Sequence, residues 1–157
     1  MDKQKLVLFD IDHTLFDTER FKESRLEKYS LYDEVLKVLS ELSKITTLGI
    51  FSQGELDFQK TKLKNTKIDS FFKEENVHVF KDKELNFAQI FTKYPDYKIF
   101  FVDDRLDLLF SAKKNFPAIS TIWIKRGPHA KNLTEIENFS PDKTVSNLQE
   151  IVKFVVK

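Results

Sequence analysis

The feature that most constrains the fold is the alternation of short apolar runs with longer segments that favour helices. Five apolar runs have the length and composition of strands: residues 6–9, 46–51, 77–80, 98–102 and 119–124. The segments that favour helices are residues 21–42, 55–64, 85–94, 106–115 and 148–156. Strands that alternate with helices are joined by right-handed βαβ crossovers. The sequence therefore predicts an α/β fold with an open, mostly parallel, Rossmann-like sheet and helices on both faces.

Local signals mark where several of these elements end. Pro95 and Pro117 follow two predicted helices, and either Ser146 or Asn147 is placed to cap the last one. The polar stretch at 126–143 is predicted to be a loop. The chain has 157 residues and shows no linker or repeat, so we expect residues 1–157 to form a single domain.

Composition excludes several classes of function. The 26 Lys and Arg residues nearly balance the 25 Asp and Glu residues, so charge does not indicate binding to nucleic acid. The absence of Cys rules out disulfides, thiolate metal sites and a cysteine nucleophile. The apolar run near the N-terminus is short and is followed by Asp10 and Asp12, so we expect no signal peptide and no membrane span. We therefore expect a cytoplasmic protein without a membrane partner.

Polar side chains follow four of the predicted strands. These strand ends are Asp10-Ile11-Asp12-His13-Thr14, Ser52-Gln53-Gly54, Lys81-Asp82-Lys83 and Asp103-Asp104-Arg105. In an open α/β sheet the ligand site lies beyond the C-terminal ends of the strands, so these residues should meet at one edge. Several carboxylates at one point repel one another unless a cation lies among them. Oxygen ligands of this kind suit Mg²⁺, with the Ser hydroxyl and the Lys ammonium free to hold phosphate oxygens. This combination indicates a site of phosphoryl transfer.

The order of these residues resembles the four motifs of the haloacid dehalogenase-like (HAD) superfamily, and most of all its phosphatases. Asp10 and Asp12 match the DxDxT run that carries the family's nucleophile and its general acid/base, and Thr14 completes that run. Ser52, followed by Gln53, matches the phosphate-binding residue of the second motif. The resemblance covers residues 6–125 and implies substrate contacts from Thr14, Ser52, Gln53 and Lys83.

The third and fourth motifs each leave a choice between two residues. Lys83 directly precedes a predicted helix and matches the phosphate-binding lysine, with Lys81 as the alternative; other lysines, such as Lys62, are expected on a solvated helix face. Asp103 and Asp104 match the acidic pair, of which Asp104 is favoured as the direct metal ligand. The resemblance implies a Mg²⁺ site made by Asp10, Asp12, Asp103 and Asp104.

The spacing of the motifs leaves no room for a cap domain. Asp12 and Ser52 are separated by 40 positions and Ser52 and Lys83 by 31, which the helices between the strands largely fill. By resemblance to capless members, the expected function is a Mg²⁺-dependent phosphatase that acts on a phosphate monoester, either a small molecule or a macromolecular end, through an aspartyl phosphate. The alternatives are a binding or regulatory domain with little turnover and a phosphotransferase with an acceptor other than water.

Overall fold

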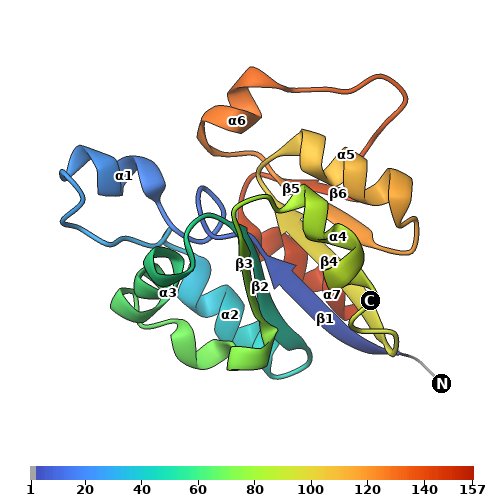
Figure 1. Ribbon diagram of the computed structural model, residues 1–157, viewed down its shortest axis with the longest axis horizontal. Helices are drawn as coiled ribbons and strands as arrows, with labels where there is room; N and C mark the ends of the chain where they lie inside the picture. The colour runs from blue at the N-terminus through green and yellow to red at the C-terminus, as the bar shows by residue number, and fades with distance from the viewer. Residues whose placement is uncertain (1–2) are drawn as a thin grey trace.

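The computed structural model describes residues 3–157, and its centre is a six-stranded parallel sheet (Figure 1). The strands are β1 (Gln4–Phe9), β2 (Thr47–Gln53), β3 (Val77–Phe80), β4 (Tyr97–Asp103), β5 (Ser120–Ile124) and β6 (Lys143–Val145). They lie in the order β3-β2-β1-β4-β5-β6, and every neighbouring pair is parallel. The predicted parallel α/β fold is confirmed.

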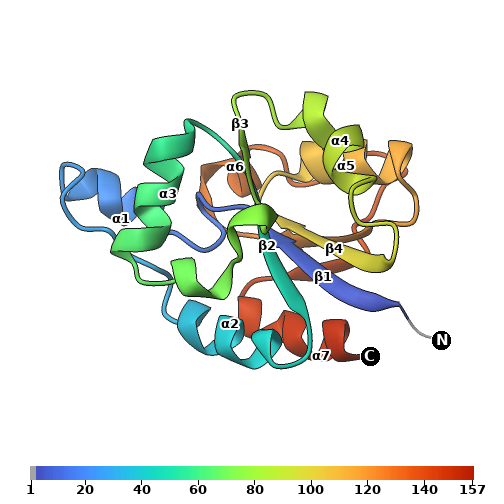
Figure 2. The same cartoon turned by 60° about the horizontal axis from the view of Figure 1, so that its bottom comes forward.

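Both faces of the sheet are covered, as the strand sequences predict. In β1, Leu6 and Leu8 belong to one apolar core, whereas Val7 and Phe9 belong to the other. Continuous apolar strands of this kind are typical of sheets buried on both sides. One face is covered by α2 (Val35–Ser43) and α7 (Ile151–Val156), and the opposite face by α4 (Phe87–Phe91) and α5 (Leu106–Asn115), as Figure 2 shows.

The helix predicted at 21–42 is wrong, because two helices with an irregular connection occupy this region. They are α1 (Thr18–Glu23) and α2 (Val35–Ser43). Arg25 and Leu26 have φ angles of 61° and 64°, and successive left-handed residues cannot continue a right-handed helix. Of the apolar residues whose spacing suggested one helix, Leu31 lies in the connection, and the others, from Val35 to Leu42, lie on α2. In Figure 1, α1 and the connection after it project from the side of the sheet.

The predicted loop at 126–143 also contains regular structure. It includes α6 (Gly127–Asn132) and leads into β6, a sixth strand that was not predicted. β6 was missed because it is three residues long, with Val145 as its one buried residue, and is defined by its pairing with β5. Strand formation here depends on a distant partner, not on local sequence.

The remaining helices agree with prediction apart from their ends, except η1 (Asp69–Phe71) and η2 (Glu74–Asn76), two short 3₁₀ helices ahead of β3 that the sequence did not predict. The others are α3 (Leu56–Asn65) and the 3₁₀ helices η3 (Glu84–Asn86), which precedes α4, and η4 (Leu148–Glu150), which precedes α7. Asn147, not Ser146, caps the last pair, since its side chain accepts a hydrogen bond from the Gln149 N–H and Glu150 completes a capping box.

The strand order reverses at β1, and this reversal determines where a ligand site can form. The chain runs outward from β1 to β3 on one side and then crosses to β4 on the other. The crevice at the C-terminal ends of β1 and β4 is therefore the expected binding position. Within residues 3–157 the connections between β1, β2 and β3 contain the helices described above and no cap domain.

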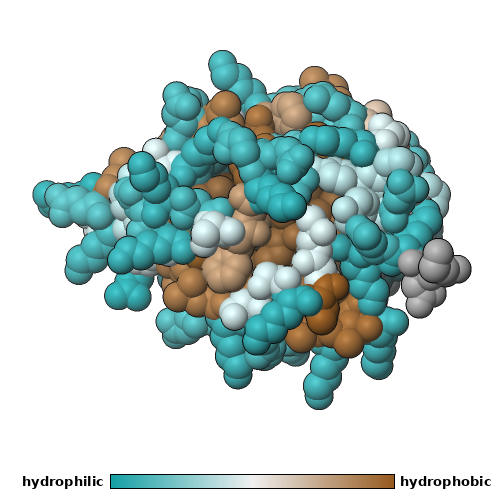
Figure 3. Space-filling model, turned by 90° about the horizontal axis from the view of Figure 1, so that it is seen from below, coloured by the Kyte–Doolittle hydropathy of each residue, from teal (hydrophilic) through white to brown (hydrophobic). Residues whose placement is uncertain are grey.

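Figure 3 shows the surface of the molecule from below. Hydrophilic side chains occupy its margin, and apolar side chains gather toward its middle. Over the described part of the chain, no helix has the length and apolar character needed to cross a membrane.

Candidate active site

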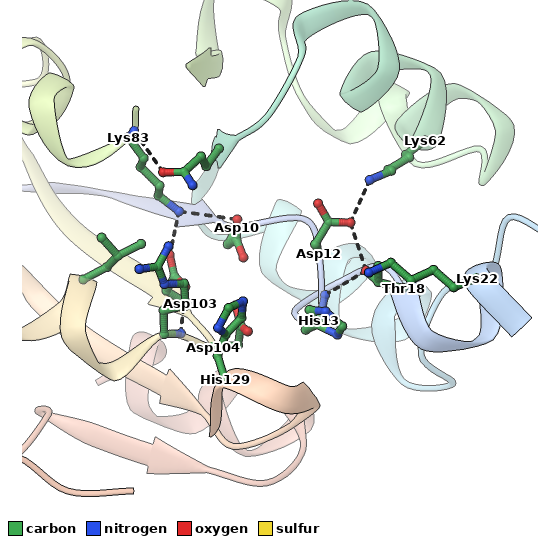
Figure 4. Close-up of a pocket in the computed structure, with 13 residues that line it drawn as sticks. Asp10, Asp12, His13, Thr18, Lys22, Lys62, Lys83, Asp103, Asp104 and His129 are labelled. Atoms are coloured by element: carbon green, nitrogen blue, oxygen red, sulfur yellow. Dashed lines mark hydrogen bonds and ion pairs between the residues drawn. The ribbon is translucent and has the colours of Figure 1, made fainter. Parts of the chain in front are cut away.

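A cavity of about 290 Å³ opens at the C-terminal edge of the sheet, where the predicted motifs meet (Figure 4). Its lining residues are Asp10, Asp12, His13, Thr18, Lys22, Gln53, Lys62, Lys83, Asp103, Asp104, Arg105, Leu108 and His129. They come from the ends of the central strands, from the turns after them, and from four flanking helices, α1, α3, α5 and α6. The structure thus brings together residues from all four motifs.

A tight turn after β1 brings the first motif to the cavity. The carbonyl oxygen of Ile11 accepts hydrogen bonds from the N–H groups of Thr14, Leu15 and Phe16. His13 adopts a φ of 63° within this turn. The turn leaves Asp10 and Asp12 on the cavity wall, while Thr14 is buried beside Asp10 with its hydroxyl 3.5 Å from Asp10 Oδ2.

Three buried carboxylates form the negative centre of the cavity. Asp10, Asp103 and Asp104 each offer an oxygen, and these oxygens lie within 4.8 Å of one another. Burial, only partly offset by the charge of Lys83, raises the pKa of Asp10 to about 7. Burial, together with the charges of Asp10 and Asp103, raises the pKa of Asp104 to about 11. The positive charge of Lys83 therefore does not balance the negative charge that the three carboxylates would carry if all were ionised.

Lys83 is the cation buried against this group. Its Nζ lies 2.6 Å from Asp103 Oδ2 and 3.4 Å from Asp10 Oδ1, and its side chain is fully buried. Although burial favours the neutral amine, the two carboxylates hold the pKa of Lys83 above its ordinary value. Lys81 is exposed. Of the two candidate lysines, Lys83 alone lines the cavity.

Asp103 and Asp104 have different surroundings. Both oxygens of Asp103 are occupied, one by Lys83 and the other by the Arg105 N–H at 2.9 Å. Asp104 Oδ2 is buried and has no hydrogen-bond partner among residues 3–157. An orphaned buried oxygen beside two further carboxylates fits a hard divalent cation such as Mg²⁺.

The carboxylate of Asp12 faces away from this group. It accepts hydrogen bonds from Thr18 Oγ1 at 2.9 Å, Lys62 Nζ at 2.7 Å and Gln59 Nε2 at 3.1 Å. Figure 4 shows Asp10 facing Lys83 and Asp12 facing Lys62. Although burial favours the neutral acid, Lys62 holds the pKa of Asp12 below its ordinary value. The structure does not bring this carboxylate to the predicted metal group.

Of the two second-motif residues, Gln53 lines the cavity and Ser52 lies buried behind the cavity wall. Gln53 lines the cavity, and its Oε1 accepts a hydrogen bond from the Lys83 N–H at 3.3 Å. Ser52 is fully buried, does not line the cavity, and receives a hydrogen bond from Gln59 Nε2 at 2.8 Å. The predicted contact between the Ser52 hydroxyl and a phosphate is therefore not preformed.

Several cavity residues were not predicted from the sequence. They are Thr18 and Lys22 on α1, Lys62 on α3 and His129 on α6. Lys62 was expected on a solvated face, but it is 5% exposed. Thr18 and Lys22 are four residues apart, which places them on one helix face. Many pairs of polar residues in this chain have the same spacing, so it does not identify these two as site residues.

No family model matches the sequence, and no curated protein matches it either. Several solved structures, in contrast, are similar to this one. A candidate HAD-like hydrolase from Burkholderia xenovorans LB400 has a TM-score of 0.80 at 21% identity, covering 98% of this chain and 97% of that one. The candidate HAD-hydrolase YfnB from Bacillus subtilis, bound to magnesium, has a TM-score of 0.76 at 14% identity. The match covers 98% of this chain and 99% of that one.

A candidate phosphatase from Clostridium difficile is similar to the same degree. Its TM-score is 0.76 at 18% identity, and the match covers 99% of this chain and 100% of that chain. The identities are low, but the matches run over almost the whole of both chains. The chain therefore has the fold of the haloacid dehalogenase-like hydrolases.

Proposed function

We propose that the protein is a Mg²⁺-dependent phosphatase that hydrolyses phosphate monoesters through an aspartyl phosphate on Asp10. The observation that carries this proposal is the group formed by Asp10, Asp103, Asp104 and Lys83 at the C-terminal ends of β1 and β4, with Asp12 on the same cavity wall. The structural similarity to a candidate phosphatase and to a magnesium-bound candidate hydrolase supports it.

Asp10 is the group placed to act as nucleophile. Its contacts with Lys83 and Thr14 are long, at 3.4 Å and 3.5 Å, so neither oxygen is held in a short hydrogen bond. An Asp10 oxygen attacks phosphorus, and the bond between phosphorus and the leaving oxygen breaks. Water then attacks the aspartyl phosphate at phosphorus, which releases phosphate and restores the carboxylate.

Asp12 is the group placed to move protons in both steps. It donates a proton to the oxygen of the departing alcohol and then accepts one from the attacking water. Because Lys62 favours the ionised form of Asp12, the donated proton is one that this carboxylate takes up when the negatively charged phosphate binds beside it. Its carboxylate lines the same cavity as Asp10 but points to a different part of it, toward α1 and α3. This separation lets Asp12 face the leaving group while Asp10 faces phosphorus.

The three buried carboxylates would hold Mg²⁺, with Asp104 as a direct ligand and Asp103 held in place by Lys83. Bound Mg²⁺ supplies positive charge to the phosphoryl oxygens and neutralises the carboxylates. The ammonium of Lys83 and the amide of Gln53 are the protein groups placed to bind further phosphoryl oxygens.

A colorimetric assay tests the proposal. The purified protein is incubated with p-nitrophenyl phosphate and Mg²⁺, with EDTA in a parallel sample and Asp10→Asn as the inactive control. We expect phosphate release that EDTA abolishes, and a mass increase of one phosphoryl group on Asp10 in rapidly quenched samples. Release that persists in Asp10→Asn would contradict the covalent route. The absence of release from any phosphate monoester in a broad panel would favour a binding domain.

A further inference from the structure

Helix α3 brings two buried polar side chains to the edge of the cavity. Gln59 and Lys62 are three residues apart, which places them on one face of the helix. Gln59 is 1% exposed and Lys62 is 5% exposed, whereas Lys64, on the same helix, is exposed. Burying a polar or charged side chain is costly unless a partner compensates, so the partners of these two residues are informative.

Lys62 is buried against Asp12. Its Nζ lies 2.7 Å from Asp12 Oδ1, and the ammonium also lies over the rings of Phe58 and Phe16, at 4.4 Å and 5.2 Å from their centroids. The aromatic rings shield the pair from water on one side, which strengthens its attraction. Asp12 is the only carboxylate within ion-pair distance of Lys62 in the described chain.

Gln59 connects the same carboxylate to the second motif. Its Nε2 donates to Asp12 Oδ2 at 3.1 Å and to Ser52 Oγ at 2.8 Å. One amide therefore joins the turn after β1 to the end of β2. With Thr18 donating to Oδ1 from α1, both oxygens of Asp12 are held by donors on two different helices.

We infer that Gln59 and Lys62 are positioning residues for Asp12, and that α3 thereby controls the proton-transfer step. The inference rests on the proposed function, in which Asp12 serves the leaving group. A carboxylate held by donors on both oxygens has one orientation, and proton transfer depends steeply on the position of the donor. Without α3, Thr18 is the remaining side-chain donor to Asp12 among residues 3–157.

Leaving groups of different basicity separate a positioning role from a structural one. Nitrophenolate leaves without a proton, whereas phenolate, a stronger base, gains more from proton donation. For Lys62→Met, we expect kcat/KM for phenyl phosphate to fall about tenfold more than kcat/KM for p-nitrophenyl phosphate. Gln59→Met, which keeps the side-chain volume, should show the same trend. Lys64→Met is the matched control and should leave both substrates unchanged.

A double-mutant cycle shows whether the effect passes through Asp12. If it does, Lys62→Met should change phenyl phosphate turnover by less than about twofold in an Asp12→Asn background. Equal losses on both substrates, or losses that multiply in the double mutant, would overturn the inference and leave the proposed phosphatase standing. A wild-type protein that hydrolyses neither substrate would overturn both. Thermal melts confirm that each variant is folded at the assay temperature.

Discussion

Lys83 Nζ lies 2.6 Å from Asp103 Oδ2, so a fully buried ion pair joins the turn after β3 to the end of β4. These elements are not neighbours in the sheet, because β2 and β1 lie between them. The pair therefore spans the carboxyl edge above β1, where Asp10 lies 3.4 Å from the same nitrogen. Fixing Asp103 in this way leaves Asp10 and Asp104 as the less constrained carboxylates of the group.

Replacing Lys83 should have a far larger effect than replacing Lys81. Lys83→Met removes the ammonium that lies over the rings of Phe51 and Phe101 and leaves Asp103 without its counter-charge, so we expect turnover to be lost and stability to fall by about 3 kcal/mol. Lys81→Met changes an exposed side chain and should alter neither. Steady-state kinetics and urea unfolding measure both effects. Equal effects of the two changes would show that Lys83 is not the lysine of the site.

Asp10→Asn should abolish turnover without destabilising the protein. The amide cannot accept the phosphoryl group. Burial outweighs the attraction of Lys83 in raising the pKa of Asp10 to about 7, so the ionised side chain is costly in the metal-free protein. We expect the free energy of unfolding in EDTA at neutral pH to rise or to fall by less than about 1 kcal/mol. Near-normal activity, or a large loss of stability, would count against this description of Asp10.

The elements that the sequence predicted best are the ones defined by local signals. The bounds of β3 and α5 agree with prediction, and the four polar strand ends do meet at one cavity. Short apolar runs that end at Asp or a polar turn show where a buried strand stops. Because parallel strands share their C-terminal edge, the prediction of a parallel sheet was enough to place their ends at one edge.

The parts that were missed depend on contacts between distant segments. Lys62 pairs with Asp12 across 50 positions, and nothing local distinguishes it from Lys64. Arg126, in the predicted loop, forms a 2.8 Å ion pair with Glu34 and donates to the Thr14 carbonyl oxygen. Gly127 lies so close to His13 that a Cβ would be 2.7 Å from its side chain. Such contacts hold α6 against the first-motif turn, and the sequence does not reveal them.

His78 should make stability depend on pH below neutrality. Burial and the nearby charge of Lys93 lower its pKa from 6.5 to about 4, and its Nε2 lies 2.7 Å from the Tyr94 hydroxyl. Between these two values the unfolded chain takes up a proton that the folded protein does not, so stability falls as pH decreases through this window. Urea unfolding at about pH 7 and about pH 5 should show a larger loss for wild type than for His78→Gln. Parallel losses in the two proteins would refute the assignment.

Mg²⁺ should stabilise the folded protein, and the two adjacent acids should respond differently to substitution. A ligand that binds only the folded state raises stability by about 2.7 kcal/mol at a concentration a hundred times its Kd. Asp104 Oδ2 has no partner among the residues that the structure describes, whereas Asp103 is paired with Lys83. Asp104→Asn should therefore abolish the Mg²⁺-dependent rise in melting temperature, and Asp103→Asn should weaken it less.

The same two variants should show the opposite order in EDTA, which separates ligand binding from structural support. Burial raises the pKa of Asp104 to about 11, so its side chain is neutral in the metal-free protein at pH 7 and an amide resembles it closely. Asp103→Asn instead removes the carboxylate that balances the buried Lys83, so it should lower the melting temperature in EDTA more than Asp104→Asn does.

Calorimetric titration with Mg²⁺ should also give tighter binding as pH rises, because the metal displaces protons from Asp10 and Asp104. Wild-type protein that binds no divalent cation at millimolar concentration would refute the metal site, and equal responses of the two variants would show that neither acid is the preferred ligand.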